Sequence, residues 1–283
     1  MATTPRDVVR AYKKTVAQTE WFALRARPWR ERFAKYPLRT VWCAVVDRFW
    51  FTVIAITKNP LVKTKTFWGQ SITVRFDENR PIVHDGLIDS KELGLTAFIV
   101  KNVSDRDIFF DIGANVGFYT LLSSALGAQV HAFEPSPETF HILEKNATSV
   151  TLVNKALMDN EGSIQFADLG AGAGLSTAMF EKDASNIITV KATTLDAYCK
   201  KHVIVPTMLK IDAENAEQYV IDGGLQTIQT YHPTLVVEGN ERIIERLQPM
   251  GYDVFQLNQD GETIPYHQGD FIFNDNLLFR ARV

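Results

Sequence analysis

Cysteine is scarce in this chain of 283 residues, and the shortage argues against two structural classes. The two cysteines, Cys43 and Cys199, lie far apart, so they provide neither a disulfide framework nor the paired spacing of a zinc site. The first thirty residues also lack the short apolar segment and small-residue cleavage site of a secretory signal. We therefore expect a cytoplasmic protein in a reducing compartment, with association to a membrane left open.

Acidic residues are scarce only in the first quarter of the chain. Residues 1–70 contain 14 Lys and Arg against 4 Asp and Glu, so the rest of the chain carries a net charge of −13. Residues 21–57 mix basic and aromatic residues with an apolar run that Asp47 and Arg48 interrupt, which argues against a spanning helix. The favoured interpretation is an amphipathic helix packed on the main domain. Contact with a membrane surface or an acidic partner through residues 21–57 is the alternative, and a homodimer stays open.

Strands and helices alternate from residue 107 onward, after a helical stretch at 5–57 and a hairpin at 65–78. The pattern predicts an α/β fold in residues 66–283, with a Rossmann-like sheet of about seven strands and a helical N-terminal extension in residues 1–65. The last two strands have no helix between them, so we expect them to pair antiparallel. The expected strands are 107–113, 128–135, 151–157, 205–214, 233–240, 252–258 and 275–283.

Two acidic residues, Asp111 and Glu134, end the first two expected strands of this sheet. Ligands of such sheets bind beyond the carboxyl ends of the strands, and Gly113 and Gly117 allow close approach to the backbone there. Glu134 is placed to accept both hydroxyls of a ribose. Asp111 would repel a pyrophosphate but suits an ammonium, so S-adenosylmethionine fits better than NAD. The alternative is that the glycines serve only helix–strand packing.

The same stretches resemble FkbM-like methyltransferases, which use S-adenosylmethionine. The resemblance rests on "DIGANVGFYT", "AFEPSPETFHILEKN", "TLDAYC", "LKIDAENAE" and "LVVEGN", and it covers roughly residues 66–282. It implies a seven-stranded methyltransferase sheet and methylation of a hydroxyl, often on a sugar or glycan. The family usually has glycine where this chain has Asn215, and Asn tolerates a left-handed backbone. It implies that the cofactor is held by Asp111, Gly113, Asn115, Gly117 and Glu134, with Ala156 and Leu157 beside the adenine. Ala114 and Pro135 are further candidate cofactor-binding residues, and Glu92, in the helix before the first strand, could close over the methionine part.

The stretch "LKIDAENAE" supplies the candidate catalytic residues Lys210, Asp212 and Glu214. It ends the fourth strand, which lies beside the first, so Asp212 is also a candidate cofactor ligand. An alcohol becomes a good nucleophile when a positioned base takes its proton, and Asp212 or Glu214 could be that base with Lys210 tuning it. The alternative is that Lys210 and Asp212 form a structural pair that only shapes the pocket.

Four residues are candidates for binding the acceptor, a small molecule or a glycan. Glu238 ends the fifth strand, Ser176 and Thr177 lie in the glycine-rich loop, and His267 precedes the last strand. A divalent cation on Asp212, Glu214 and Glu238 is conceivable, but the spacing does not require one, and no metal ligands are assigned. The acidic catalytic part argues against nucleic acid. The rival functions are a methyltransferase for RNA or protein and a non-catalytic nucleoside-binding protein, with a dehydrogenase as a weaker third.

Overall fold

The computed structural model describes residues 4–16, 21, 27–88, 91–167, 187–239, 241–267, 269–270 and 276–282. Internal contacts group the chain into two compact units, Met1–Leu93 and Gly94–Val283. The sequence predicted the boundary at residue 65, whereas in the structure the hairpin and the short helix that follows it group with the N-terminal unit.

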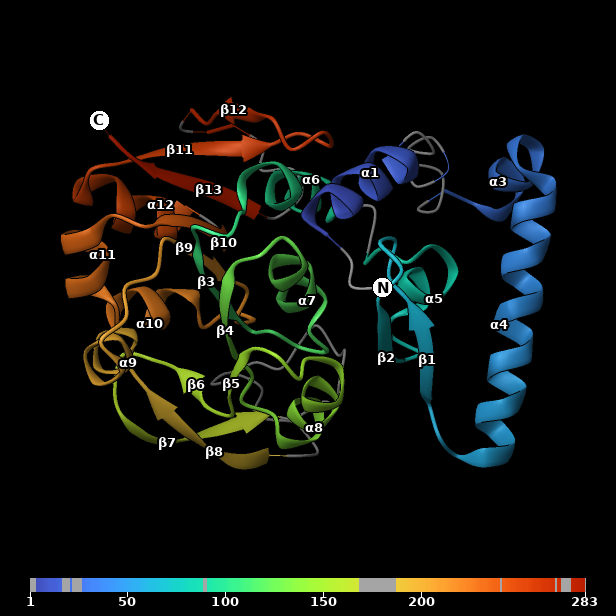
Figure 1. The fold of residues 1–283 in the computed structure, drawn as a ribbon, viewed down its shortest axis with the longest axis horizontal. Coiled ribbons are helices and arrows are strands. Elements are labelled where there is room, and N and C mark those ends of the chain that lie inside the picture. Colours follow the sequence, from blue (N-terminus) through green and yellow to red (C-terminus); the bar gives the residue numbers. More distant parts are fainter. Residues whose placement is uncertain are drawn as a thin grey trace. The chain divides into compact units, whose positions relative to one another are not determined.

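The N-terminal unit consists of helices and one antiparallel hairpin (Figure 1). The hairpin strands β1 (Leu61–Lys65) and β2 (Ser71–Arg75) pair with Val62 opposite Val74, so the predicted hairpin is confirmed with slightly earlier strands. The helices are α1 (Pro5–Val16), α3 (Trp29–Lys35), α4 (Pro37–Thr57) and α5 (Arg80–Asp85).

Helix α4 is long and apolar enough to cross a membrane by length and composition, with a mean hydropathy of 1.4 in its most apolar window and 11% of that window buried. Asp47 and Arg48 therefore do not exclude a span on composition, contrary to the sequence argument. The favoured interpretation, an amphipathic helix packed on the main domain, stays a prediction. Only Thr40 and Cys43 of α4 are fully buried, and large apolar side chains are exposed along it.

The second unit is built on an eight-stranded mixed sheet in the order β12-β11-β13-β10-β9-β3-β4-β5. Strands β5, β4, β3, β9 and β10 run parallel, and β13 lies antiparallel between β10 and β11. The predicted Rossmann-like sheet of about seven strands with an antiparallel last strand is confirmed, and the short β12 is added at its edge. The strands are β3 (Ile108–Ile112), β4 (Gln129–Phe133), β5 (Thr151–Val153), β9 (Met208–Ile211), β10 (Thr234–Glu238), β11 (Tyr252–Leu257), β12 (Thr263–Pro265) and β13 (Asn276–Ala281).

Helices cover the two faces of this sheet, and the strands are apolar on both sides for that reason (Figure 1). On one face, Phe110, Leu209 and Leu235 join a core with side chains of the helices between β8 and β11. On the other face, helix α7 packs on β3 and β4. The helices are α6 (Leu93–Asn102), α7 (Phe118–Ala125), α8 (Pro137–Asn146), α9 (Leu195–His202), α10 (Glu217–Asp222), α11 (Leu225–Tyr231) and α12 (Glu241–Leu247), followed by the 3-10 turn η1 (Gln248–Met250).

The predicted third strand, 151–157, is divided in the structure. Its first half is β5, and its second half, β6 (Ala156–Leu157), joins a separate sheet of order β6-β8-β7. The side-chain amide of Asn154 donates to the carbonyl oxygens of Glu134 (2.8 Å) and Pro135 (3.1 Å), which turns the chain between the two halves. The small sheet contains β7 (Gly162–Ala167) and β8 (Ile187–Thr193).

Candidate functional site

A cavity that is partly open to solvent lies beyond the carboxyl ends of β3, β4 and β9. The chain changes direction on the two sides of β3, because β4 follows it along one edge of the sheet and β9 follows much later along the other. This is the switch point where open α/β sheets bind ligands. The lining residues include Ile112, Gly113, Asn115, Phe133, Glu134, Pro135, Thr139, Lys155, Ala156, Leu157, Met158, Phe166, Asp212, Ala213, Glu214 and Ala216.

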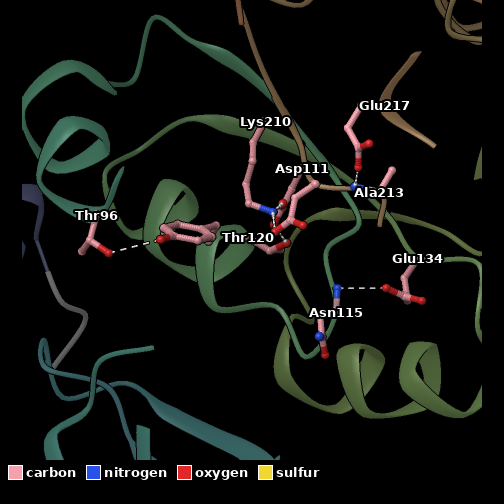
Figure 2. A network of polar contacts seen from close by, with 10 residues as sticks. Thr96, Asp111, Asn115, Thr120, Glu134, Lys210, Ala213 and Glu217 are labelled. Carbon is pink, nitrogen blue, oxygen red and sulfur yellow. Dashed lines mark hydrogen bonds and ion pairs between the residues drawn. The ribbon is translucent and has the colours of Figure 1, made fainter. Parts of the chain in front are cut away.

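Glu134 is fixed at the end of β4 by two backbone N–H groups. The amide of Asn115 donates to its Oε2 (Figure 2) and the amide of Ser136 donates to its Oε1, both at 2.9 Å. The side chain is buried but lines the cavity, so its remaining lone pairs face the place where a ligand would lie. A carboxylate held in this way can accept the two hydroxyls of a ribose. Apolar walls from Phe133, Leu157 and Met158 complete a setting suited to a nucleoside.

Gly113 allows β3 and β9 to meet at the cavity. Its φ is +76°, and a Cβ atom at this position would lie 1.7 Å from the carbonyl oxygen of Asp212. No side chain fits at that distance, so the glycine serves both its backbone conformation and a close approach within the fold. Its own N–H donates to the carbonyl of Phe133 (3.0 Å) and is therefore used by the neighbouring strand.

A buried network joins the first and fourth parallel strands just below the rim (Figure 2). Lys210 Nζ lies 3.1 Å from Asp212 Oδ2 and 3.5 Å from Asp111 Oδ1. Thr120 of α7 donates to Asp111 Oδ2 at 2.6 Å, and the ammonium of Lys210 lies over the ring of Tyr119. The ion pair between Lys210 and Asp212, which the sequence left open as a structural alternative, is present.

Asp111 lies deeper than its predicted contact with a ligand ammonium requires. It is fully buried, it is not among the cavity-lining residues, and Thr120 and Lys210 contact its two oxygens. Burial raises the pKa of Asp111, and the charge of Lys210 opposes that shift. The residue belongs to β3, one position before its end, and points toward α7. We therefore infer that it positions Lys210, and through it Asp212.

Carboxyl groups gather beyond β9 and β10, where Asp212 and Glu214 line the cavity and Glu238 does not. Burial raises the pKa of Glu214 to about 7, and the charges of Asp212 and Glu217 add to the effect. Burial likewise raises the pKa of Glu238 to about 9, strengthened by the charge of Asp212 and a hydrogen bond to it. Glu217, whose pKa burial also raises, accepts a hydrogen bond from the amide of Ala213 (2.9 Å). The structure thus brings the predicted residues Asp212, Glu214 and Glu238 together.

The turn after β9 holds two residues in the left-handed region. Glu214 has φ of +50° and Asn215 has φ of +71°. Asn adopts this conformation readily, which explains how the turn forms without the glycine usual in the resembling family. A glutamate there is uncommon, and such strain is often found where a side chain must be aimed into a site. Glu214 does line the cavity.

The other predicted residues fall into four groups. Pro135, Ala156 and Leu157 line the cavity, as does Asn115. Ala114 and Gly117 lie in the adjoining turn and do not line it; Gly117 packs against Leu143. Glu92 belongs to the N-terminal unit and is not a lining residue. Ser176 and Thr177 lie outside the described residues.

His267 does not reach the rim that the sequence predicted for it. Strand β12 runs back along β11, so that the amide of Tyr266 bonds to the carbonyl of Val254, near the start of β11. His267 follows there, exposed, with its amide bonded to Asp270.

Sequence reasoning missed several residues of the site. Thr120 and Tyr119 were given no role, although the alternation of β3 places Asp111 toward the helix that follows it. Lys155, Met158 and Phe166 line the cavity because the third strand divides, which its composition did not indicate. Among the described residues, no group of His, Cys, Asp or Glu is arranged to hold a metal ion.

Comparison with known proteins identifies a family. A family model described as "Methyltransferase FkbM domain" matches residues 111–265. The hexuronic acid methyltransferase AglP of Haloferax volcanii is 25% identical over 149 residues, which cover 51% of this chain and 61% of that protein. The chain therefore matches less than two thirds of this curated relative's length.

Two solved structures match parts of the chain. The methyltransferase FkbM of Methylobacillus flagellatus KT has a TM-score of 0.42 and 16% identity, covering 63% of this chain and 44% of its own. A tRNA m1G37 methyltransferase of M. jannaschii also has a TM-score of 0.42, with 13% identity over 80% of this chain and 58% of its own. Likeness at this level carries no argument about activity.

The network below the rim predicts that Thr120→Val destabilises the protein. The substitution keeps the shape of the side chain but removes the hydrogen bond to the buried Asp111 carboxyl, so we expect a loss of about 1.5–3 kcal/mol. The free energy of unfolding in urea measures this loss. Thr189→Val, at an exposed position of β8, is the matched control and should change stability little. Equal losses in the two variants would contradict the proposed network.

Because Gly113 lies so close to Asp212, we predict that Gly113→Ala lowers the free energy of unfolding by much more than the strain of a left-handed backbone alone would. Gly251 has φ of +90° with no atom near its added Cβ, so Gly251→Ala measures the strain, about 1–2 kcal/mol. Gly113→Ala should exceed that loss, because β3 and β9 must also separate. Urea midpoints of the two variants provide the comparison, and similar values would show that the strands adjust without cost.

Proposed function

The chain belongs to the FkbM methyltransferase family, and from this premise we propose that it transfers the methyl group of S-adenosylmethionine to a hydroxyl of a sugar or glycan. Its activity as an S-adenosylmethionine-dependent methyltransferase follows from the family. The class of acceptor, a sugar or glycan hydroxyl, is proposed beyond what the family gives. It is supported by the curated relative, which by its name methylates a hexuronic acid, and by the carboxyl groups beyond β9 and β10.

The residues of the cavity fit the cofactor from its ribose to its charged end. Glu134 would accept the ribose hydroxyls, and Phe133, Leu157 and Met158 would contact the adenine. The carboxyl groups beyond Gly113 suit the positive sulfonium and ammonium groups. When bound, S-adenosylmethionine supplies an electrophilic methyl group. The observation that carries the assignment is Glu134, held by two backbone amides inside the cavity at the tip of β4.

The acceptor hydroxyl needs a base at the same end of the cavity. Glu214 is the best candidate, because it lines the cavity and its pKa of about 7 leaves it basic near neutral pH. Glu238, with a pKa of about 9, would stay protonated at that pH, hydrogen-bonded to Asp212. Lys210 fixes Asp212 beside both groups and does not itself line the cavity.

A panel of acceptors tests the proposal. The full chain would be incubated with S-adenosylmethionine and neutral, amino- or uronic-acid-containing glycans, with RNA and a protein mixture as other arms, and formation of S-adenosylhomocysteine measured. We expect turnover with a glycan alone. Glu134→Gln should weaken binding of S-adenosylhomocysteine by about 10–100-fold, because it replaces an acceptor of the ribose hydroxyls. Turnover only with RNA or protein would contradict the acceptor class, and unchanged binding by the variant would contradict the role of Glu134.

The raised pKa of Glu214 predicts the pH dependence of the reaction. Its acidic form dominates below about pH 7, so kcat/KM should rise with pH up to that value and then level. Glu214→Gln should lower kcat/KM by about 10²–10⁴-fold and remove this limb. Glu144→Gln, on the exposed side of α8, is the control and should retain it. An unchanged limb in Glu214→Gln would assign the base to another residue.

A further inference from the structure

Helix α4 turns its polar side toward its own unit. Asp47 lies 3.0 Å from His84 Nε2 and 3.8 Å from Arg80 of α5, and Arg39 lies 2.7 Å from Asp85. Thr40 and Cys43, which share this side, are the fully buried residues of the helix. In a helix of an ordinary folded unit the apolar side is the one that packs inward. Here the inward side is mixed, because it carries these charged pairs together with Trp50 and Phe51, whose rings pack near Phe76.

The opposite side of α4 carries a continuous row of large apolar residues. At 100° per residue, the five members fall within about 60° of one another around the helix axis. They are well exposed, with Leu38 at 87%, Val45 at 61% and Ile56 at 76%. Contiguous exposed apolar surface of this kind marks a site of interaction with a protein or a membrane. We call it the α4 stripe: Leu38, Trp42, Val45, Phe49 and Ile56.

Basic and aromatic residues extend the α4 stripe at its N-terminal end. Residues 27–39 contain five Arg and Lys against one acid, and Arg27 and Arg30 are exposed. Trp29 and Phe33 of α3 stack on each other with ring centroids 4.8 Å apart, and both are exposed. Exposed tryptophan and phenylalanine beside arginine are typical of surfaces that rest at the boundary between lipid headgroups and acyl chains.

We propose that α4 and α3 dock the protein on an anionic lipid bilayer, with α4 lying in the plane of the surface. The apolar stripe would enter the headgroup boundary, and the basic residues would contact anionic headgroups. The charge of the segment argues for lipid over a second copy of the chain, since two copies would bring their basic residues together.

The polar side of α4 decides between lying on the bilayer and crossing it. Its 21 residues would span about 31 Å, close to the hydrocarbon thickness of a bilayer. Crossing would bring Asp47 and Arg48 into the hydrocarbon and would separate Asp47 from His84 and Arg80, which belong to a folded unit. Lying flat preserves these contacts and buries only the stripe.

Vesicle flotation of the full chain tests the proposal. The protein would be mixed with vesicles of phosphatidylcholine alone, or with an equal part of phosphatidylglycerol. We expect binding at least about tenfold tighter to the anionic vesicles, decreasing with salt. The triple variant Leu38→Ser, Val45→Ser, Phe49→Ser should bind at least about 100-fold more weakly, because it lacks three apolar side chains that the bilayer would partly bury. Alkaline carbonate should release the bound protein, since no segment crosses the bilayer.

A matched control removes exposed apolar residues of the other unit: Ile187→Ser, Val203→Ser, Tyr231→Ser. This variant should bind vesicles as the normal chain does, and both triple variants should bind S-adenosylhomocysteine normally. Absence of vesicle binding, or equal binding by the stripe variant, overturns the proposal, and resistance to carbonate overturns the flat orientation. A lipid-free dimer that the stripe variant abolishes, measured by sedimentation, would assign the stripe to a second copy. None of these outcomes bears on the methyl acceptor.

Discussion

The buried ammonium of Lys210, set between the carboxyl groups of Asp111 and Asp212, fixes the geometry on which the cavity depends. One positive charge meets two negative ones. Lys210 and Asp111 are buried, whereas the Asp212 side chain is 36% exposed, so loss of Lys210 would leave Asp111 buried without a compensating charge. Asp111 lies opposite Lys210 in adjacent strands, and Asp212 directly follows the end of β9. The network therefore ties the end of β9 to β3 and determines where Asp212 enters the cavity.

The carboxyl groups at the two ends of the cavity have different surroundings, and this difference gives them different chemical roles. Backbone amides hold both oxygens of Glu134, a setting that suits a fixed hydrogen-bond acceptor. Glu214 and Glu238 lie among other carboxyl groups, where burial and repulsion favour the neutral form. A bound cation would relieve that repulsion. The charge of the ligand and the protonation state of these carboxyl groups are therefore coupled. A positive sulfonium would favour their deprotonated form, which is the form that can accept a proton from the alcohol.

Much of this arrangement could be predicted from the sequence, because strand ends are marked by local signals. Asp111, Gly113 and Glu134 follow apolar runs that predict buried strands, and parallel strands bring their carboxyl ends together. What could not be predicted depended on alternation and on distant contacts. Asp111 is one residue short of the strand end and faces α7, and Asn154 divides the third strand through bonds to the chain after β4. The loop before His267 reverses direction for reasons of pairing in β12, which its composition does not encode.

Helix α4 also shows that distant contacts limit what its sequence can predict. The sequence predicted a helix here, but it could not tell which residues pack inward, since that depends on Arg80, His84 and Asp85 of a later helix. Charge adds a second asymmetry: residues 1–93 carry a net charge of +8 and residues 94–283 a net charge of −11. Near an anionic surface the first would be attracted and the second repelled, within a Debye length of about 8 Å. The charge distribution therefore favours approach through the N-terminal unit, and the apolar stripe would supply the short-range attraction that salt does not screen.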